Sequence, residues 1–200
     1  DPALSIDERV RVKSVQGQRM FGVDLKIVDE DGKRLPHDGK ASGELFVRGN
    51  AIVNGYFNNE AATAAALDSE GWFGTGDVAR ISPNGFLSVV DRTKDMVKSG
   101  GEWISSIDVE NTVMSCPGVA NAAVIGVPHP KWTERPVLIV VKAPGADLTK
   151  EAILAHVAQK LATWQVPDDV IFAESLPMTA TGKVSKRELR ATYGSHVLPG

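Results

Sequence analysis

Hydrophobic and polar residues alternate with a period of two along much of the first ninety residues, which is the pattern of half-buried β-strands. The expected elements are strands at 23–28, 44–48, 78–81 and 86–90, and an alanine-rich helix at 58–67. The sequence Ser82-Pro83-Asn84-Gly85 separates the last two strands and predicts a hairpin turn. Asn58 or Asn59 is placed to cap the helix. Residues 1–20 show no clear pattern, so the first part of the chain is expected to be mostly β.

The pattern changes after Asp91, where apolar strands and amphipathic helices begin to alternate. The expected strands are 96–98, 103–104, 122–127, 137–142 and 170–172, and the expected helices are 105–116, 149–161 and 185–191. The apolar face of the second of these helices consists of Ile153, Leu154, Val157 and Leu161. The boundary therefore lies near residues 91–95. We predict an α+β chain with two domains, at 1–93 and 94–200.

Composition narrows the classes of protein that this chain can represent. With 42% apolar and 24% charged residues among 200, it can bury a core. Its net charge of −3, without a Lys/Arg-rich run, gives no electrostatic case for nucleic-acid binding. No apolar stretch approaches the roughly 20 residues that span a bilayer. The single Cys116 excludes an internal disulfide, and we expect a reducing, cytoplasmic location.

The ends and the histidines add two further expectations. The chain begins at Asp1-Pro2 without methionine, and its first elements resemble those of the middle of a longer protein, so we expect a fragment.

The histidines share no spacing typical of metal ligands, and no Ser-His-Asp arrangement is present. Cys116 is expected to be a small buried residue. We therefore expect no protein-metal site.

A turn-rich loop near the C-terminal end carries a lysine directly after a glycine, at Gly182-Lys183. Such a lysine presents a mobile ammonium that suits an anionic oxygen. The loop is not a Walker-type phosphate loop. That pattern needs glycine where Pro177 stands and Ser or Thr where Val184 stands. Another kind of anion site must therefore explain Lys183.

Three further segments have both a structural and a functional interpretation. Residues 74–79 fit a loose dinucleotide pattern, but a turn precedes them and a hairpin follows. Asp77 is therefore either a turn residue bonded to its own backbone or an acceptor for a ribose diol. The charged run 91–95 is either a solvated linker or a hinge in which Arg92 binds an anion or diol and Lys94 and Asp95 lie at the pivot.

The third segment, 98–103, places Gly100-Gly101 between two short strands. It is either a hairpin with Trp103 packed on the core or the wall of a groove that admits a thin chain. The other tryptophans, Trp72, Trp132 and Trp164, are expected to be packing residues.

The order and spacing of these motifs resemble the adenylate-forming superfamily of acyl-CoA synthetases, luciferases and peptide-synthetase adenylation domains. The motifs are Gly43-Glu44-Leu45-x-Val47-x-Gly49, Gly55-Tyr56, Thr75-Gly76-Asp77, Asp91-Arg92, Gly100-Gly101-Glu102 and Thr181-Gly182-Lys183. The resemblance implies that the chain is the β-rich end of the large AMP-binding domain followed by the small mobile domain. It also implies that the family's phosphate loop and adenine-binding segment precede this stretch and are missing.

The resemblance further implies a reaction in two halves, in which a carboxylic acid and Mg-ATP form an acyl-adenylate and a CoA thiol then displaces AMP. Lys183 is implied as the catalytic residue of the first half, with Asp77, Arg92 and Lys183 binding the nucleotide. The Mg²⁺ ion is held mainly by ATP and by the missing N-terminal portion. The implied hinge is Lys94. The residues implied to line the CoA channel are Lys98, Gly100, Gly101 and Trp103.

Within the superfamily, residues 98–105 look most like CoA ligases of medium-chain fatty acids, including the branch that uses methylmercaptopropionate. The alternatives are a luciferase-like enzyme, a peptide-synthetase module or a non-catalytic nucleotide-binding module. The fragment alone is expected to be inactive, because half of the nucleotide site is missing. A homo-oligomer is left open.

Overall fold

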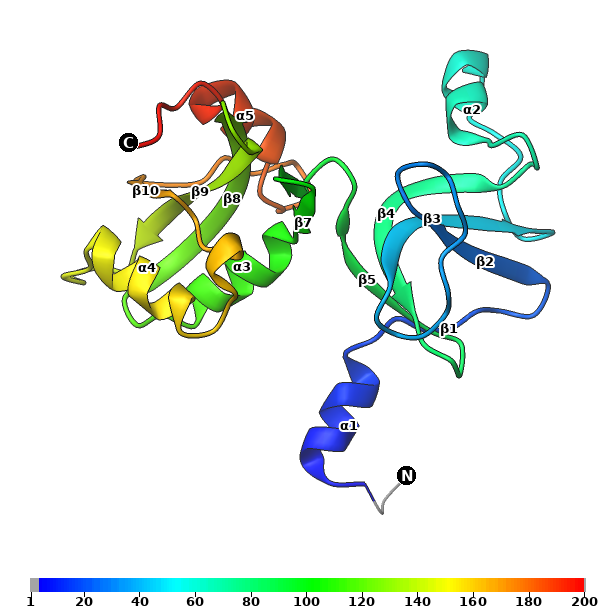
Figure 1. Ribbon diagram of the computed structural model, residues 1–200, viewed down its shortest axis with the longest axis horizontal. Coiled ribbons are helices and arrows are strands. Elements are labelled where there is room, and N and C mark those ends of the chain that lie inside the picture. Colours follow the sequence, from blue (N-terminus) through cyan, green and yellow to red (C-terminus); the bar gives the residue numbers. More distant parts are fainter. Residues whose placement is uncertain (1–3, 200) are drawn as a thin grey trace. The chain divides into compact units, whose positions relative to one another are not determined.

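The structure, a computed structural model, describes residues 4–199, with the side chain of Arg11 excepted. The chain divides into two compact units, Asp1–Lys94 and Asp95–Gly200. Each unit has its own sheet and its own apolar core (Figure 1). The fold is α+β, as the sequence predicts.

The first unit contains a five-stranded antiparallel sheet in the order β1-β5-β4-β3-β2. Its strands are β1 (Gly17–Gln18), β2 (Val23–Val28), β3 (Ser42–Gly49), β4 (Phe73–Ile81) and β5 (Phe86–Arg92). Alternate residues of β2, β3 and β4 bury the core side chains Ile27, Leu45, Ala79 and Ile81. The sequence predicts the four longer strands, although β3 and β4 extend further than expected.

Local sequence signals account for the turn and the helix of this unit. Gly85 N donates a hydrogen bond to Ser82 O at 2.8 Å and closes the β4–β5 hairpin. Helix α2 (Glu60–Ala66) begins after Asn59, whose side chain accepts a hydrogen bond from Ala62 N at 3.0 Å. Of the two capping candidates, Asn59 is therefore the cap.

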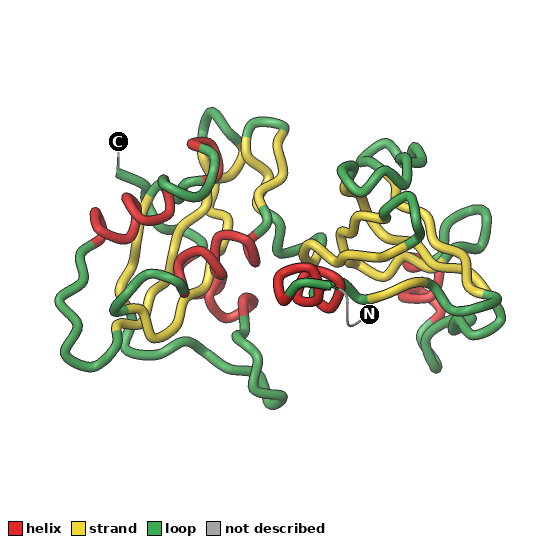
Figure 2. The backbone as a smooth tube through the Cα atoms, turned by 90° about the horizontal axis from the view of Figure 1, so that it is seen from below, coloured by secondary structure: helices red, strands yellow, loops and turns green. Residues whose placement is uncertain are grey.

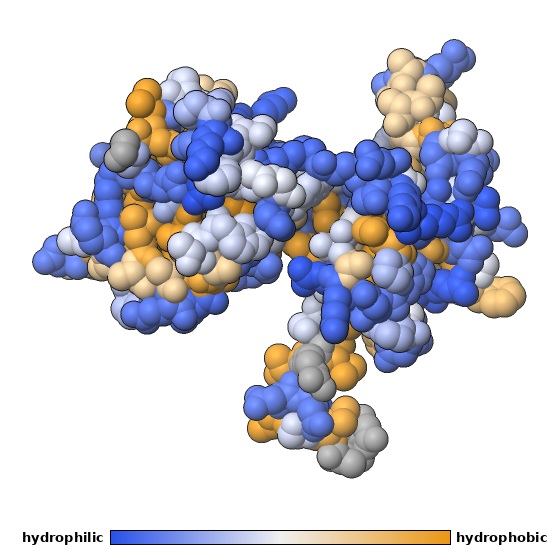
Figure 3. Space-filling view, viewed as in Figure 1, coloured by the Kyte–Doolittle hydropathy of each residue, from blue (hydrophilic) through white to orange (hydrophobic). Residues whose placement is uncertain are grey.

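Residues 1–20 show no clear pattern in the sequence, and the structure places helix α1 (Ile6–Lys13) there. Ser5 and Glu8 form a capping box, in which Ser5 N donates to Glu8 Oε2 at 2.8 Å. This Ser-x-x-Glu signal is present in the sequence and predicts the start of a helix. Ile6 and Val10 lie exposed on α1, and apolar side chains are visible on this helix in Figure 3. Residues 1–3 lie outside the described part of the chain.

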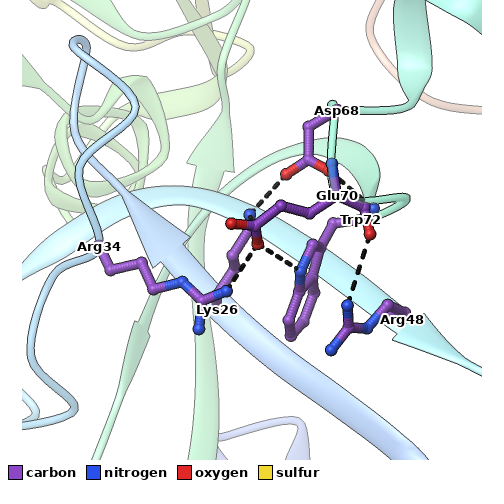
Figure 4. A network of polar contacts seen from close by, with 6 residues as sticks. All are labelled: Lys26, Arg34, Arg48, Asp68, Glu70 and Trp72. Carbon is purple, nitrogen blue, oxygen red and sulfur yellow. Dashed lines mark hydrogen bonds and ion pairs between the residues drawn. The ribbon is translucent and has the colours of Figure 1, made fainter.

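A cluster of charged groups surrounds Trp72 at the start of β4 (Figure 4). Lys26 projects from β2 with its Nζ 4.9 Å from the centroid of the Trp72 ring and hydrogen-bonds to Asp68. The Cζ atoms of Arg34 and Arg48 lie 5.2 Å and 4.3 Å from the same ring. Three cations therefore pack against one buried indole, an arrangement favoured by the negative face of the ring.

Two carboxylates balance these cations. Partial burial acts to raise the pKa of Asp68, but the hydrogen bond from Lys26 and those from the backbone N–H groups of Trp72 and Glu70 outweigh it. The pKa of Asp68 is therefore lowered from its ordinary value of 3.8. A hydrogen bond from Arg34, at 2.8 Å, is the main cause of the lowered pKa of Glu70. The cluster thus fixes the 68–71 turn through charged pairs.

The second unit is built on a mixed sheet in the order β10-β9-β6-β7, with β8 also paired to β9. Its strands are β6 (Val97–Ser99), β7 (Glu102–Ile104), β8 (Val119–His129), β9 (Thr133–Lys142) and β10 (Asp169–Phe172). Its helices are α3 (Ser106–Met114), α4 (Lys150–Ala158), the 3-10 turn η1 (Thr163–Gln165) and α5 (Lys186–Tyr193). β10 is parallel to β9, because α4 lies in the crossover between them.

Strands β8 and β9 are covered on both faces, which explains their almost continuous apolar sequence. Val124 and Leu138 join the core that α3 and α4 complete with Val113 and Ile153. Their strand neighbours Ile125 and Ile139, with other residues, form a second core that includes Leu189 of α5. Helices consequently lie on both sides of these strands (Figure 2). Ser105 and Thr149 cap α3 and α4 by accepting hydrogen bonds from backbone N–H groups.

One expectation about this unit is wrong. Helix α4 ends at Ala158, so Leu161 packs on the core from beyond the helix. Trp132 and Trp164 are 40% and 41% exposed, whereas Trp72 of the first unit is buried. Within the described part of the chain, none of the helices has the length and apolar character needed to cross a membrane.

Replacing Lys26 by methionine tests the charged cluster. Asp68 then stays partly buried without its ammonium partner, so we expect the free energy of unfolding at pH 7 to fall by about 1–3 kcal/mol. Because the folded pKa of Asp68 is lowered, the stabilisation by this pair is present above pH 3.8 and is lost as the pH falls through the folded pKa. The free energy of unfolding, measured by urea unfolding of the chain at pH 7 and at acid pH, should therefore fall less on acidification in Lys26→Met than in the wild type.

The matched control is Arg19→Met, which removes an exposed pair with Asp24 on the same strand. We expect it to change the stability little, since exposed pairs contribute little. An equal loss of stability in both variants, or an unchanged acid effect in Lys26→Met, would contradict the role assigned to Lys26.

Candidate active site

Asp77 and Arg92 lie directly opposite each other on β4 and β5. Arg92 Nε is 2.9 Å from Asp77 Oδ1, and the two side chains are 59% and 22% exposed. The expectation that Asp77 lies on a turn is wrong, because the residue is inside β4. Gly76, with φ of +72°, and a register shift after Val78 make the strand irregular here. Such irregularities aim a side chain away from the regular ladder.

Neighbouring groups fix the orientation of this pair. Thr75 Oγ1 accepts a hydrogen bond from Asp77 N and donates one to Leu45 O, both at 3.1 Å. The carboxylate of Asp91 accepts a hydrogen bond from Arg92 N at 2.7 Å. One oxygen of Asp77 is bound by Arg92, which leaves the second able to accept hydrogen bonds from hydroxyl groups. The pair can therefore bind a diol through the carboxylate and an anion through the guanidinium.

The charged run 91–95 is not a uniformly solvated linker, so that alternative is wrong for two of its members. Asp91 is only 2% exposed, and Asp95 forms an ion pair with Arg190 of α5. Lys94 itself is exposed and is the last residue of the first unit. Exposure at a unit boundary is compatible with the pivot that the sequence predicts there.

Lys183 lies on a closed turn between the isolated bridge partners Met178 and Val184. Thr179 N donates to Lys183 O at 2.7 Å, and Lys183 N donates to Thr179 Oγ1 at 3.1 Å. Gly182 has φ of +76°, a conformation that favours glycine. The turn therefore fixes the backbone of Lys183 while its side chain is exposed.

Two ion pairs hold α5, the helix that begins three residues after Lys183. Lys186 Nζ lies 2.8 Å from Glu110 Oε1 of α3 and also hydrogen-bonds to Ser106. Arg190, one turn further on, pairs with Asp95. These anchors were not predicted from the sequence. A signal is present, since Lys186 and Arg190 are at i and i+4 beside the buried Leu189, on the same side of the helix.

The glycine pair lies at the tip of the β6–β7 ribbon, where Gly100 and Gly101 have φ of +62° and +87°. Lys98 and Trp103 face each other across the ribbon, with Lys98 Nζ 4.5 Å from the centroid of the ring. Trp103 is half-buried, so it is neither a pure core residue nor fully exposed. The ribbon thus offers a backbone free of side chains beside a cation and an aromatic ring.

Trp132 explains why residue 100 must be glycine. A Cβ atom on Gly100 would lie 2.7 Å from Cε3 of Trp132, and Gly100 N donates to Trp132 O at 2.9 Å. Trp132 therefore packs against the ribbon instead of the core. The Nζ atom of its neighbour Lys131 lies 4.3 Å from the centroid of the Trp132 ring. No sequence signal links Trp132 to Gly100, because the contact depends on the pairing of β6 with β9.

The histidines whose contacts are described have structural partners. His156 Nε2 lies 2.9 Å from Ser115 Oγ, and His196 Nε2 lies 2.8 Å from Asp169 Oδ2. Cys116 is buried, as expected. Among the described residues, His, Cys, Asp and Glu side chains form no group of three or more that could hold a metal ion. The candidate site residues Asp77, Arg92 and Lys183 offer a carboxylate, a guanidinium and an ammonium group.

The chain was compared with known proteins by sequence. Residues 108–183 match the family of AMP-binding enzyme C-terminal domains. The chain is 51% identical over 190 residues to the 3-methylmercaptopropionyl-CoA ligase of Ruegeria lacuscaerulensis, covering 95% of this chain and 35% of that protein. It is 45% identical over 195 residues to the medium-chain-fatty-acid–CoA ligase of Ectopseudomonas oleovorans, covering 98% and 35%. The chain therefore spans about a third of the length of these curated relatives.

Solved structures show the same fold. ATP-bound MatB from Rhodopseudomonas palustris matches with a TM-score of 0.82 and 33% identity over 90% of this chain and 36% of that chain. The amide bond synthetase McbA from Marinactinospora thermotolerans matches with a TM-score of 0.80 and 34% identity over 93% and 38%. Residues 108–183 thus belong to the AMP-binding enzyme C-terminal domain family, and the chain as a whole is similar to about a third of the CoA ligases it matches.

Proposed function

We propose that the protein is an ATP-dependent carboxylic acid–CoA ligase that acts on a fatty or short- to medium-chain acyl acid. The observation that carries the proposal is the separation of two complementary sites. The Asp77–Arg92 pair lies in one unit, and the exposed Lys183 turn and the glycine ribbon lie in the other. Relatives named as CoA ligases of such acids match nearly all of this chain, which supports the choice of substrates.

In the first half-reaction, a carboxylate oxygen attacks the α-phosphorus of Mg-ATP, and the bond to the leaving pyrophosphate breaks. Asp77 accepts hydrogen bonds from the ribose hydroxyls, and Arg92 contacts the same ribose. Lys183 reaches the oxygens of the carboxylate and the α-phosphate. Negative charge concentrates on these oxygens in the transition state, and a positioned ammonium stabilises it more there than in the ground state. Mg²⁺ neutralises the phosphates of ATP.

In the second half-reaction, the CoA sulfur attacks the carbonyl carbon of the acyl-adenylate. The bond between that carbon and the AMP oxygen breaks, AMP leaves, and the thiol proton passes to solvent. A turn of the chain at Lys94 withdraws Lys183 and brings the ribbon to the reaction. Gly100 and Gly101 then admit the pantetheine arm, with Lys98 and Trp103 beside it, since a backbone without side chains lets a narrow chain pass.

The remaining portion of the enzyme supplies the adenine and acyl sites and the other ligands of the Mg²⁺ ion. The exposed apolar residues of α1, Ile6 and Val10, are the surface that we assign to contact with that portion. Because those sites are supplied by the rest of the enzyme, we propose that the 200-residue chain alone is inactive. We also propose that the whole enzyme acts in the cytoplasm.

A second candidate function differs only in the molecule that accepts the acyl group from the acyl-adenylate. The likeness to an amide bond synthetase makes an amine the alternative to the CoA thiol. Release of AMP from a purified acyl-adenylate, measured with CoA and with small amines, separates the two. The CoA ligase predicts release that depends on CoA.

Lys183→Ala in the full-length enzyme tests the first half-reaction. We expect ATP–pyrophosphate exchange to fall about 10²–10³-fold, which is the usual cost of removing one charge-stabilising donor from an active site. Thioester formation from supplied acyl-adenylate should keep its rate. The control Lys160→Ala removes another exposed lysine of the same unit and should change neither rate. Exchange at the wild-type rate in Lys183→Ala would exclude the assigned role.

Asp77→Ala tests the ribose site. Hydrogen bonds to a charged group contribute about 1.5–3 kcal/mol, so we expect the KM for ATP to rise roughly 10- to 100-fold. We also expect the variant to lose any discrimination against 2′-deoxy- and 3′-deoxy-ATP, because the group that reads the hydroxyls is gone.

The matched control is Asp24→Ala, which removes a carboxylate paired with an exposed arginine in the same sheet. Its exchange kinetics should equal those of the wild type. If Asp77→Ala weakened ATP and both deoxy analogues in equal proportion, the carboxylate would have a structural role and not a diol-binding one.

A further inference from the structure

The β6–β7 ribbon has little backbone pairing to the rest of its sheet. Within the ribbon, three residue pairs join the two strands. Between the ribbon and β9, the described ladder contains the single pair Ser99↔Thr133. A hydrogen bond from Gly100 N to Trp132 O adds to it. Side chains must therefore contribute to fixing the ribbon.

Arg135 of β9 makes one of these side-chain contacts. Its Nη1 donates to Ser99 Oγ at 2.9 Å, directly before the glycine pair. The guanidinium also donates to the carbonyl oxygens of Trp164 and Val166 and to the carboxylate of Asp168, at 2.6–2.8 Å. The side chain is only 11% exposed. With its planar group bonded at every nitrogen, Arg135 is a rigid support for Ser99.

Glu134, the preceding residue, makes the second contact. Its Oε2 accepts a hydrogen bond from Lys98 N at 3.1 Å. To reach the ribbon, the carboxylate crosses the backbone of Gly126 on β8. A Cβ atom on Gly126 would lie 2.7 Å from that Oε2 atom. Gly126 does not have the positive φ that favours glycine, so the space for Glu134 is what a side chain at 126 would remove.

The two contacts hold consecutive residues, Lys98 and Ser99, immediately before Gly100. We propose that Glu134 and Arg135 are positioning residues for thiol transfer, which set where the glycine tip of the ribbon stands. The inference rests on the proposed function, in which Gly100 and Gly101 admit the pantetheine arm. A thiol that is held only slightly out of line reacts far more slowly, because the attack depends on geometry. Adenylation depends on Lys183 and does not need the ribbon.

The test uses two small substitutions in the full-length enzyme, on different strands. Ser99→Ala removes one hydroxyl and leaves Arg135 bound to Asp168, Trp164 and Val166. Gly126→Ala pushes the flexible end of Glu134 away from Lys98 N and leaves the carboxylate able to reach solvent. For each variant we expect kcat/KM for CoA, measured from purified acyl-adenylate, to fall about 10-fold. ATP–pyrophosphate exchange should stay within about twofold of the wild type, since no contact of Lys183 is altered.

A double variant makes the test specific to Glu134. If Gly126→Ala acts by displacing the carboxylate, adding Glu134→Ala to it should lower kcat/KM for CoA no further. Additive losses would show that Gly126→Ala acts through packing and would overturn the role of Glu134.

Thr149→Ala is the control for a general loss of stability, because Thr149 caps α4 in the same unit and does not contact the ribbon. Both half-reactions of this variant should match the wild type. Normal CoA kinetics in Ser99→Ala and Gly126→Ala, or a parallel loss of exchange in both, would overturn the inference alone. A wild-type enzyme without exchange activity would overturn the proposed function and this inference with it.

Discussion

The burial of both faces of β8 and β9 is the constraint on which the second unit depends. Because neighbouring residues of a strand point to opposite faces, two separate cores must be completed by helices. Helices α3 and α4 complete one core, and Leu189 places α5 on the other. The position of α5 in turn fixes the turn of Lys183, which directly precedes it. The candidate catalytic lysine is therefore placed by a packing requirement of two strands to which it does not itself belong.

Polar contacts add precision to this arrangement. Lys186 and Glu110 join α5 to α3 by an ion pair. In the first unit, the Asp77–Arg92 pair likewise depends on a strand irregularity and on the hydrogen bonds that Asp77 N and Arg92 N donate to Thr75 and Asp91. In both units the exposed functional groups stand on a backbone fixed by less exposed partners. This division suits sites that must bind an anion or a diol repeatedly without rearranging.

Much of the fold is predictable from local sequence, because alternation, caps and turns act over a few residues. The strand at Val23–Val28 and the caps Asn59 and Thr149 are examples. The glycines at 74 and 76 led to the wrong prediction of a turn at Asp77, since glycine occurs in turns and in irregular strands alike. The residue types of the candidate site follow from motifs, but their partners do not. The contacts of Arg135 and Trp132 join segments distant in sequence and exist only once the sheet has formed.

The ion pair between Asp95 and Arg190 has a mechanical consequence. Asp95 is the first residue after Lys94, and Arg190 lies on the helix that follows Lys183. The chain just beyond the proposed pivot is thus clamped to the element that carries the lysine. If the chain turns at Lys94 as proposed, this ion pair joins the first residue beyond the pivot to α5, so that α5 and the turn of Lys183 move with it.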